Sequence, residues 1–417
     1  MKEQQTERWH AVYLNSVHIG DLIYRGNVTR FRFVDDYWSR PDRPVLGLQF
    51  EDNPKSEPRG NMKLPSWFSN LLPEDPLRTW IANDRDVSPD REMELLIRIG
   101  RDLPGAVIVD EVARESAEAG PTVLDSRSSE LDQENNQLKF SLAGVAMKFS
   151  TLQRGDRLVL PGRNQIGSWI VKLPDPNYEQ VPSNEAAMMT LAGLVGIEVP
   201  EHRLVHRDLL GSEIGPYWAS KEVNGYAVKR FDRTDRGTRV HIEDFAQVKG
   251  IPADRTSKYQ GTFETVGSYC FRGRDVASLM EWTRRMAFNL AIGNGDAHLK
   301  NWSLIYPDTK RPKLSPAYDL VSTVQYLHSD NFGLLFNGER EFRRIRPDSF
   351  KRFGDRLRES FGSQAEVTGD DLEGEASRTM SLVQSNLDEV IDVYPHAKDM
   401  IVWVRDHTEQ MRRQLCL

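Results

Sequence analysis

The chain has 417 residues, of which 39% are hydrophobic and 28% charged, enough for a sizeable core and for two or three globular units. This composition excludes collagen-like, mucin-like and wholly disordered proteins. The net charge is -7, whereas a protein that wraps nucleic acid is normally basic, so we expect any DNA contact to be local or made through a partner.

The cysteines and the apolar segments predict a cytoplasmic protein. Cys270 and Cys416 lie too far apart in sequence for a disulfide framework or a Cys-x-x-Cys metal pair, which favours a reducing compartment. The first residues, MKEQQTERWHAVYLN, lack the apolar core of a secretory signal. No apolar run reaches the ~20 residues of a membrane span, so we expect no membrane partner.

Residues 1–109 predict an N-terminal subdomain that is rich in strands. Four short runs, HAVYLN, DLIYR, TRFRFV and VLGLQF, carry β-branched and aromatic residues between turn residues. Two runs in 65–105, WFSNLLP and REMELLIRIG, predict helices, the second ending at Gly100. No catalytic cluster stands out here, and the sequence leaves open whether this unit recognises a partner or packs as a cap.

The rest of the chain predicts a linker and two lobes. Residues 110–136 are polar and acidic, which is typical of a linker. Residues 137–233 contain strand-like runs, one helix predicted at 184–196, and the hinge strand YAVKRFD. Residues 234–417 are predicted to be mainly helical from 275, with one hairpin at 302–317. This order predicts an α+β, two-lobed arrangement with a β-rich lobe before a helical lobe.

The segment GNGDAHLKN, residues 293–301, carries the clearest chemical pattern. Asp296 and Asn301 are five positions apart in a predicted loop, and Asp319 follows the next hairpin. Protein kinases space a catalytic base and a metal-binding amide in this way and place a metal-binding carboxylate after the following hairpin. Turn chemistry alone also produces Asp and Asn in loops, but the hairpin and Asp319 favour a kinase. We therefore predict Asp296 as the base and Asn301 and Asp319 as magnesium ligands.

A second pattern lies upstream, in the strand SWIVKLP. Alternation along this strand puts Lys172 on the face opposite Val171. Glu185 is predicted near the start of the next helix, with Ser183 or Asn184 as N-cap, and on its inward face. Each residue also has a simpler interpretation: Lys172 as the end of a strand that reaches solvent, and Glu185 as an acid in the first turn of a helix. A carboxylate on the inward face of a helix, however, needs a partner for its charge. In protein kinases, a lysine that is paired with a glutamate contacts the phosphates of ATP.

The loop between Ser141 and Lys148 is a candidate phosphate loop. Gly144 and Lys148 suit backbone contact with phosphate, although the pattern alone favours a simple hairpin and is not a known Gly-rich motif. Its place ahead of Lys172 favours the phosphate loop. The hinge strand would then bring backbone groups of residues 229–231 to the adenine. The predicted nucleotide contacts are Ser141, Ala143, Gly144, Val145, Ala146, Lys148, Lys172, Glu185, Lys229, Arg230, Phe231, His298 and Lys300.

Taken together, these segments resemble the HipA family of toxin kinases, from bacterial HipA–HipB toxin–antitoxin modules, over nearly the whole chain. NLLPEDPLR and LIRIGRDLPGAV match the N-terminal subdomain of the family, FSLAGVAMK its phosphate loop and IVKLP its lysine strand. NEAAMM matches its first kinase helix, AVKRFDR its hinge, and GNGDAHLKN with YDL its catalytic and metal motifs. One departure is Ala146 and Met147, where many members carry Gln-Glu or Gln-Pro.

The resemblance implies a two-lobed, protein-kinase-like (HipA-like) fold and a Ser/Thr protein kinase that uses ATP and Mg²⁺. It implies an aminoacyl-tRNA synthetase, such as glutamyl-tRNA synthetase, as the protein substrate, and Ser141 as an autophosphorylation site that switches the kinase off. It also implies a HipB-like helix-turn-helix antitoxin as partner, and operator DNA contacted mainly through that antitoxin.

Other interpretations stay open at this point. A small-molecule kinase of the aminoglycoside or choline type uses the same Asp, Asn and Asp spacing, and a non-catalytic co-repressor scaffold would tolerate the altered loop. The basic stretch Arg340–Arg358 is either a phosphate-contacting surface or a solvated helix face. His202 and His206 fall in a predicted strand and are interpreted as structural.

Overall fold

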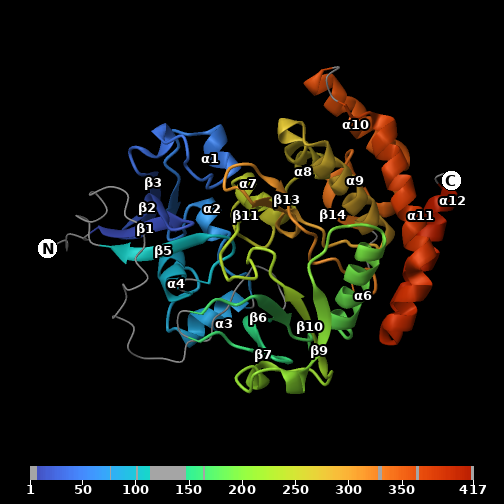
Figure 1. The fold of residues 1–417 in the computed structure, drawn as a ribbon, viewed down its shortest axis with the longest axis horizontal. Coiled ribbons are helices and arrows are strands. Elements are labelled where there is room, and N and C mark those ends of the chain that lie inside the picture. The colour runs from blue at the N-terminus through green and yellow to red at the C-terminus, as the bar shows by residue number, and fades with distance from the viewer. Residues whose placement is uncertain are drawn as a thin grey trace.

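The structure is a computed structural model that describes residues 7–75, 77–99, 102–112, 147–162, 165–326, 331–362 and 366–414. Figure 1 shows the N-terminal subdomain at one end, the long C-terminal helices at the other, and the strands β6 to β10 between them. Residues 113–136 of the predicted linker and residues 141–146 of the predicted phosphate loop lie outside the described residues.

The N-terminal subdomain is built on an antiparallel five-stranded sheet in the order β4-β3-β2-β1-β5. Its apolar face packs against short helices through fully buried aromatic side chains, among them Phe31, Trp67 and Phe68. The elements are β1 Arg8–Leu14, β2 Val17–Arg25, β3 Val28–Phe33, α1 Leu48–Asp52, β4 Arg59–Asn61, α2 Ser66–Ser69, α3 Leu77–Asp84, α4 Glu92–Ile99 and β5 Val107–Val112.

Three features of this subdomain differ from the sequence prediction. The run VLGLQF, predicted as a strand, forms none: its last three residues begin the helix α1. Gly47 precedes it, and a Cβ at this position would lie 2.5 Å from Trp67 Nε1, so the chain packs here too closely against Trp67 for a side chain. The prediction also missed the strands β4 and β5. Since β5 pairs with β1 as far as Val112, the sheet continues three residues into the predicted linker.

The N-lobe sheet has the strand order β7-β6-β8-β10-β9. One face of β8 buries Trp169 and Val171 in the same core as the N-terminal subdomain, so these two units share one apolar core. The opposite face of the sheet contributes Tyr226 and Val228 to a core with the C-lobe helices. The elements are β6 Lys148–Arg154, β7 Arg157–Val159, β8 Trp169–Lys172, α6 Val181–Leu194, β9 His202–His206 and β10 Asn224–Lys229.

The C-lobe is mainly helical, with α9 at its centre. The predicted apolar stripe of α9, which includes Leu279, Trp282 and Met286, is fully buried. The predicted hairpin is β12–β13, but a second hairpin, β14–β15, was not predicted. The elements are β11 His241–Asp244, α7 Phe245–Val248, α8 Phe263–Cys270, α9 Val276–Ala291, β12 Ser303–Tyr306, β13 Lys313–Leu314, β14 Asn331–Phe336, β15 Glu339–Glu341, α10 Pro347–Phe361, α11 Gly369–Val393 and α12 Lys398–Gln414.

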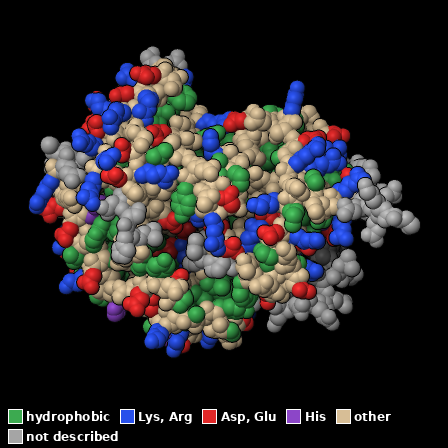
Figure 2. Space-filling view, turned by 180° about the vertical axis from the view of Figure 1, so that it is seen from behind, with side chains coloured by type: hydrophobic (Ala, Val, Ile, Leu, Met, Phe, Trp, Pro, Cys, Tyr) green, Lys and Arg blue, Asp and Glu red, His purple; other side chains and the backbone are tan. Residues whose placement is uncertain are grey.

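Acidic and basic side chains are interspersed over the face that Figure 2 shows, opposite the view of Figure 1. Within the predicted basic stretch, Lys351 pairs with Asp370 and Arg356 pairs with Glu264. None of the helices in the described parts of the chain combines the length and the apolar character needed to cross a bilayer.

Glu243 on β11 ties the N-terminal subdomain to the C-lobe. Its buried carboxyl group accepts hydrogen bonds from the Leu48 backbone N–H at 2.9 Å, from Trp67 Nε1 at 3.1 Å and from the Tyr306 hydroxyl. Burial raises the pKa of Glu243 to about 7, although these donors oppose the shift. The protonated carboxyl therefore stabilises the folded protein at low pH, and this contribution is lost as the pH rises from the unfolded-state pKa through about 7.

Replacement of Glu243 tests this linkage. Glu243→Gln keeps a neutral side chain of similar shape at every pH, so the free energy of unfolding of the variant relative to wild type is expected to rise by about 2 kcal/mol between about pH 5 and pH 8. Urea denaturation at both pH values measures the difference. An unfolding difference that is the same at both pH values would show that Glu243 keeps one protonation state throughout.

Candidate active site

A cleft lies between the N-lobe sheet and the C-lobe. It is lined by residues from all three units: from the N-terminal subdomain, the N-lobe strands β6, β8 and β10, the hinge, and the loops around β12 and β13. The lining includes Asn70, Pro104, Lys148, Ile170, Lys172, Lys229, Arg230, Phe231, Lys300 and Asp319. Seven of the predicted site residues line this cleft, and three more, Asp296, His298 and Asn301, lie in the loop that carries Lys300.

Lys172 is the charged centre of this cleft. It stands at the end of β8 on the face opposite the core, as the alternation of the strand predicts. Its Nζ lies 2.5 Å from Glu185 Oε1 on α6 and also contacts Asp319 Oδ1. The predicted pair of Lys172 and Glu185 is therefore present, and Asp319 adds a second carboxylate. The ring of Tyr226 lies 5.6 Å from Nζ and adds a cation–π contact.

The pKa values of the three groups diverge because they share one buried site. Burial alone would lower the pKa of Lys172, but Asp319 and Glu185 outweigh it and hold that pKa above its usual range. Burial raises the pKa of Glu185 to about 7, and Asp319 adds to the shift although Lys172 opposes it. For Asp319, Lys172 and Lys148 outweigh burial and lower the pKa to about 2. Asp319 is therefore ionised at neutral pH, whereas the pKa of Glu185 is raised by its burial.

Lys148 stands beside Lys172 on the neighbouring strand. The two lysines are direct antiparallel partners across β6 and β8, so both side chains leave the sheet on the cleft face. Burial lowers the pKa of Lys148 to about 8, and the nearby Lys172 adds to the shift, against Asp319. Two neighbouring cations in a cleft suit an anionic ligand such as a polyphosphate.

The loop after α9 carries the predicted catalytic residues. Gly293 has a φ of 63°, and a Cβ there would lie 2.7 Å from Trp403, so the helix ends in a turn that favours glycine. Asn301 Oδ1 accepts from the His298 backbone N–H at 3.2 Å, and Asn301 Nδ2 donates to Asp319 Oδ2 at 3.4 Å. The structure therefore brings the two predicted metal ligands into contact.

The donor set at Asn301 and Asp319 fits magnesium. Both side chains offer oxygen atoms, and each retains an acceptor site beyond the bonds given above. Within the described part of the chain, no group of three or more His, Cys, Asp or Glu side chains could form a metal cage. Magnesium normally takes one or two protein ligands together with phosphate oxygens and water, so a two-residue site suits this ion. Asp319 has a φ of 55°, a left-handed conformation that is costly for a non-glycine residue and is often found at functional sites.

The start of α6 differs from the prediction and explains how Asp319 is supported. The helix begins at Val181 with Gln180 as N-cap, and Pro182 occupies the first turn, where proline is favoured. Ser183 is therefore not the cap, and neither is Asn184, which also lies inside the helix. Its side chain donates to the Ser322 carbonyl at 2.8 Å and accepts from the Ser322 N–H at 3.0 Å. This pair of bonds fixes the segment after Asp319 against α6.

Two other predicted residues face the N-terminal subdomain. Lys300 is buried and donates to Asn70 Oδ1 at 3.0 Å, and it lies 3.7 Å from Glu74 Oε1. His298 is also buried, and burial lowers its pKa to about 4, so the imidazole is neutral at neutral pH. Asn70 and Glu74 were not predicted as site residues, because they lie more than 200 residues upstream in a segment without a catalytic pattern.

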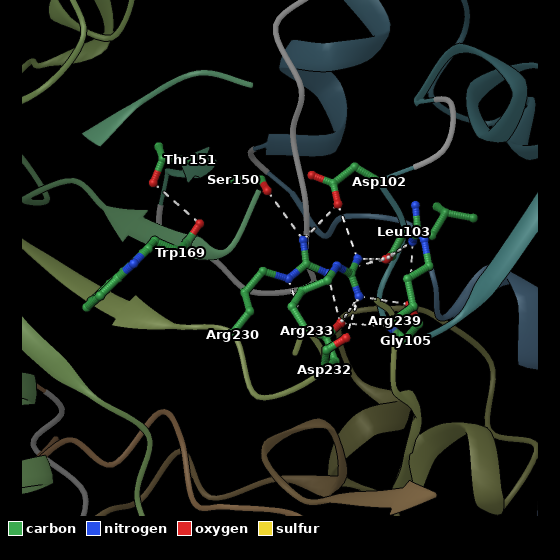
Figure 3. Close-up of polar contacts among 10 residues, drawn as sticks. All are labelled: Asp102, Leu103, Gly105, Ser150, Thr151, Trp169, Arg230, Asp232, Arg233 and Arg239. Atoms are coloured by element: carbon green, nitrogen blue, oxygen red, sulfur yellow. Dashed lines mark hydrogen bonds and ion pairs between the residues drawn. The ribbon is translucent and has the colours of Figure 1, made fainter. Parts of the chain in front are cut away.

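A buried ionic cluster joins the hinge to the N-terminal subdomain, as Figure 3 shows. The Arg230 guanidinium contacts Asp102 Oδ1 at 2.9 Å and Asp232 Oδ2 at 2.8 Å. Arg233 contacts the same two carboxylates at 3.2 and 2.9 Å and donates to the Gly105 carbonyl at 2.9 Å. The predicted adenine contact at 229–231 concerned backbone groups, and these residues line the cleft, so that contact stays a prediction while the Arg230 side chain holds two units together.

Removal of one member of this cluster is expected to destabilise the protein. Arg230→Met would leave Asp102 and Asp232 with less compensation in a buried site, which costs about 3–5 kcal/mol. Denaturant unfolding measures the loss, with Arg344→Met, an exposed arginine paired with Glu341, as matched control. Equal unfolding free energies for the two variants would contradict this account of the cluster.

The sequence and the fold resemble those of known proteins. Two family descriptions match the chain, the HipA N-terminal domain over residues 10–110 and the HipA-like C-terminal domain over residues 140–387. The chain is 45% identical over 318 residues to "Putative kinase Y4dM" of Sinorhizobium fredii, which covers 74% of this chain and 75% of that protein. It is 27% identical over 349 residues to "Serine/threonine-protein kinase toxin HipA" of Shewanella oneidensis, covering 76% and 75%.

Among solved structures, a chain of the Shewanella oneidensis complex of HipA, HipB and operator DNA matches with a TM-score of 0.72, covering 97% of both chains at 20% identity. This match confirms the predicted two-lobed, kinase-like α+β fold. The C-terminal family description alone spans more than half of the chain, and the N-terminal description accounts for the sheet subdomain. The chain belongs to the HipA family.

Proposed function

We propose that this protein is a Ser/Thr protein kinase that uses Mg-ATP and acts as a toxin. The observation that carries the proposal is that Lys172 and Asp319 line one cleft and contact each other, while Glu185 contacts Lys172 and Asn301 contacts Asp319. Asp296 lies in the same loop as Asn301. These residues come from four segments of the chain: β8, α6, the loop after α9 and the segment after β13. Kinases require this set: a lysine with its glutamate, a base, and two oxygen ligands for magnesium.

Each residue has a distinct task in the proposed reaction. Lys172 and Lys148 hold and neutralise the phosphates of ATP, and Glu185 keeps Lys172 in place. Asn301 and Asp319 would hold magnesium, which supplies positive charge at the phosphate oxygens when it is bound. Asp296 accepts the proton of the acceptor hydroxyl as that oxygen bonds to the γ-phosphorus and ADP leaves. His298 is neutral at neutral pH and therefore adds no charge beside Asp296.

Further parts of the proposal rest on the family. Residues 141–146 of the predicted phosphate loop lie outside the described residues. Ser141, in this segment, remains the proposed site of autophosphorylation and self-inactivation. An added phosphate would carry about two negative charges, which repel the phosphates of ATP. The solved Shewanella relative is bound to HipB and operator DNA, which supports a HipB-like antitoxin as partner and DNA contact through it. The proposed target is an aminoacyl-tRNA synthetase in the cytoplasm.

The experiment that tests this function compares acceptors. Purified protein is incubated with Mg²⁺ and γ-labelled ATP and with glutamyl-tRNA synthetase, an aminoglycoside or choline in separate reactions. A further reaction contains a bacterial lysate. Label on the synthetase, or on another protein of the lysate, is the expected result. Label on the aminoglycoside or choline alone would replace the protein kinase with a small-molecule kinase. Absence of ATP binding in calorimetry would replace it with a non-catalytic scaffold.

A further inference from the structure

Asp296, the proposed base, is held by a tyrosine from another part of the C-lobe. The Tyr259 hydroxyl donates to Asp296 Oδ1 at 2.5 Å. Within the described residues this is the only hydrogen bond recorded to the Asp296 carboxylate. The contact engages one of the two carboxylate oxygens and leaves Oδ2 for a second donor. A hydrogen bond to an ionised carboxylate is among the stronger neutral-to-charged contacts in proteins.

Tyr259 is itself fixed from several sides. It ends a short 3₁₀ turn, Ser257–Tyr259, in the connection between α7 and α8. Asp254 closes this turn by accepting from the Ser257 N–H at 2.7 Å and from the Ser257 hydroxyl at 2.6 Å. The Tyr259 carbonyl accepts from Arg340 Nη2 at 3.3 Å, and the ring packs edge-on against His298 at 5.3 Å. These contacts hold the turn that carries Tyr259, and they therefore fix its hydroxyl beside Asp296.

The N-terminal subdomain reaches the same turn. Lys258, which directly precedes the tyrosine, is buried, and its Nζ lies 2.7 Å from Glu74 Oε2. Lys300 in the catalytic loop lies on the other side of Glu74, 3.7 Å from Oε1. Burial would raise the pKa of Glu74, but Lys300 and Lys258 outweigh it and lower that pKa, so the carboxylate is charged at neutral pH. One glutamate of the N-terminal subdomain thus joins the turn that carries Tyr259 to the loop that carries Asp296.

We propose that Tyr259 is a positioning residue for the phosphoryl transfer proposed above, and that Glu74 holds it in place through Lys258. Its hydroxyl fixes Oδ1 of Asp296 so that Oδ2 faces the acceptor hydroxyl. The inference rests on the proposed function, because it assigns Tyr259 a task in that reaction. It also gives the N-terminal subdomain a part in the site beyond packing.

The test is Tyr259→Phe in the full chain, with Tyr269→Phe as matched control. Tyr269 lies on α8 and packs against Phe245 in the C-lobe, away from the cleft. Loss of a hydrogen bond to a charged group is expected to lower kcat for protein phosphorylation roughly ten- to hundredfold, with the Kd of Mg-ATP unchanged. Introduced into Asp296→Asn, Tyr259→Phe is expected to cause no further loss, since the tyrosine acts through that carboxylate.

The outcomes separate this inference from the proposed function. Full activity of Asp296→Asn would overturn the proposed function itself. Loss of activity in Asp296→Asn, with Tyr259→Phe as active as Tyr269→Phe, would overturn only the positioning role. Phosphate found on Tyr259 would make the tyrosine an acceptor and would also overturn it.

A second variant tests the tie to the N-terminal subdomain. Lys258→Met keeps Tyr259 but removes its link to Glu74. A smaller loss of kcat at unchanged ATP affinity is expected, and a wild-type kcat would overturn the part assigned to Glu74.

Discussion

Asp296→Asn is expected to abolish phosphoryl transfer, with a loss of kcat of about 10²–10⁴-fold, while the affinity for Mg-ATP is retained. An amide cannot accept the proton of the acceptor hydroxyl, which is the task we assign to Asp296. The amide oxygen can still accept from the Tyr259 hydroxyl, so the contact that holds the side chain is preserved. The variant therefore removes the chemistry with little change in structure.

The measurement pairs phosphorylation of a protein acceptor with calorimetric binding of a non-hydrolysable ATP analogue. The matched control is Asp392→Asn, an exposed aspartate on α11 far along the chain from the cleft segments. Equal loss of transfer in both variants would point to a general effect of the substitution. Transfer at the wild-type rate by Asp296→Asn would remove Asp296 from the mechanism.

Lys172→Met is the second substitution with a large expected effect. It removes the cation that contacts both Glu185 and Asp319, in a buried site where an unpaired charge costs about 3–5 kcal/mol. Because the same cation is proposed to hold the phosphates of ATP, the variant is expected to lose both nucleotide affinity and folding stability. We expect kcat/KM to fall at least about a hundredfold, with a clear decrease in Tm.

A double variant separates these two losses. Lys172→Met with Glu185→Gln leaves Asp319 as the single carboxylate of the group, so part of the lost stability is expected to return while activity stays absent. Lys313→Met, an exposed lysine on β13, is the control for loss of a positive charge. Recovery of activity in the double variant would show that Lys172 stabilises the fold without binding phosphate.

The sequence predicts those parts of the site whose residues follow a local pattern in one strand, helix or loop. The alternation of β8 predicts the face on which Lys172 lies, and the inward stripe of α6 predicts a partner for Glu185. The spacing of Asp296, Asn301 and Asp319 around a hairpin predicts that these residues act together. Each of these inferences needs only the period of one strand or helix and the requirement that a buried charge be paired.

The contacts that the sequence does not predict join residues distant along the chain. Tyr259 and Glu74 lie 37 and 222 residues from Asp296, in segments without a catalytic pattern, and only the fold brings them together. The helix α1 is a similar case, since Gly47 before it packs closely against Trp67 from another segment. Local propensity predicts a strand there, and tertiary packing overrides it.

The structure also addresses the part played by the N-terminal subdomain, which the sequence left open. This unit shares an apolar core with the N-lobe, contributes Asn70 and Pro104 to the cleft, and joins the hinge through Asp102. It is therefore more than a separate cap, because its residues line the same cleft as Lys172.

The measurement that tests the central claim most directly is phosphosite mass spectrometry of the purified protein after incubation with Mg-ATP, alongside Asp296→Asn. The account predicts phosphate on Ser141 in the wild type and none in the variant, with both proteins binding ATP. Equal phosphorylation of the two proteins, or the absence of ATP binding by the wild type, would contradict the claim that this cleft is a Mg-ATP phosphotransfer site with Asp296 as its base.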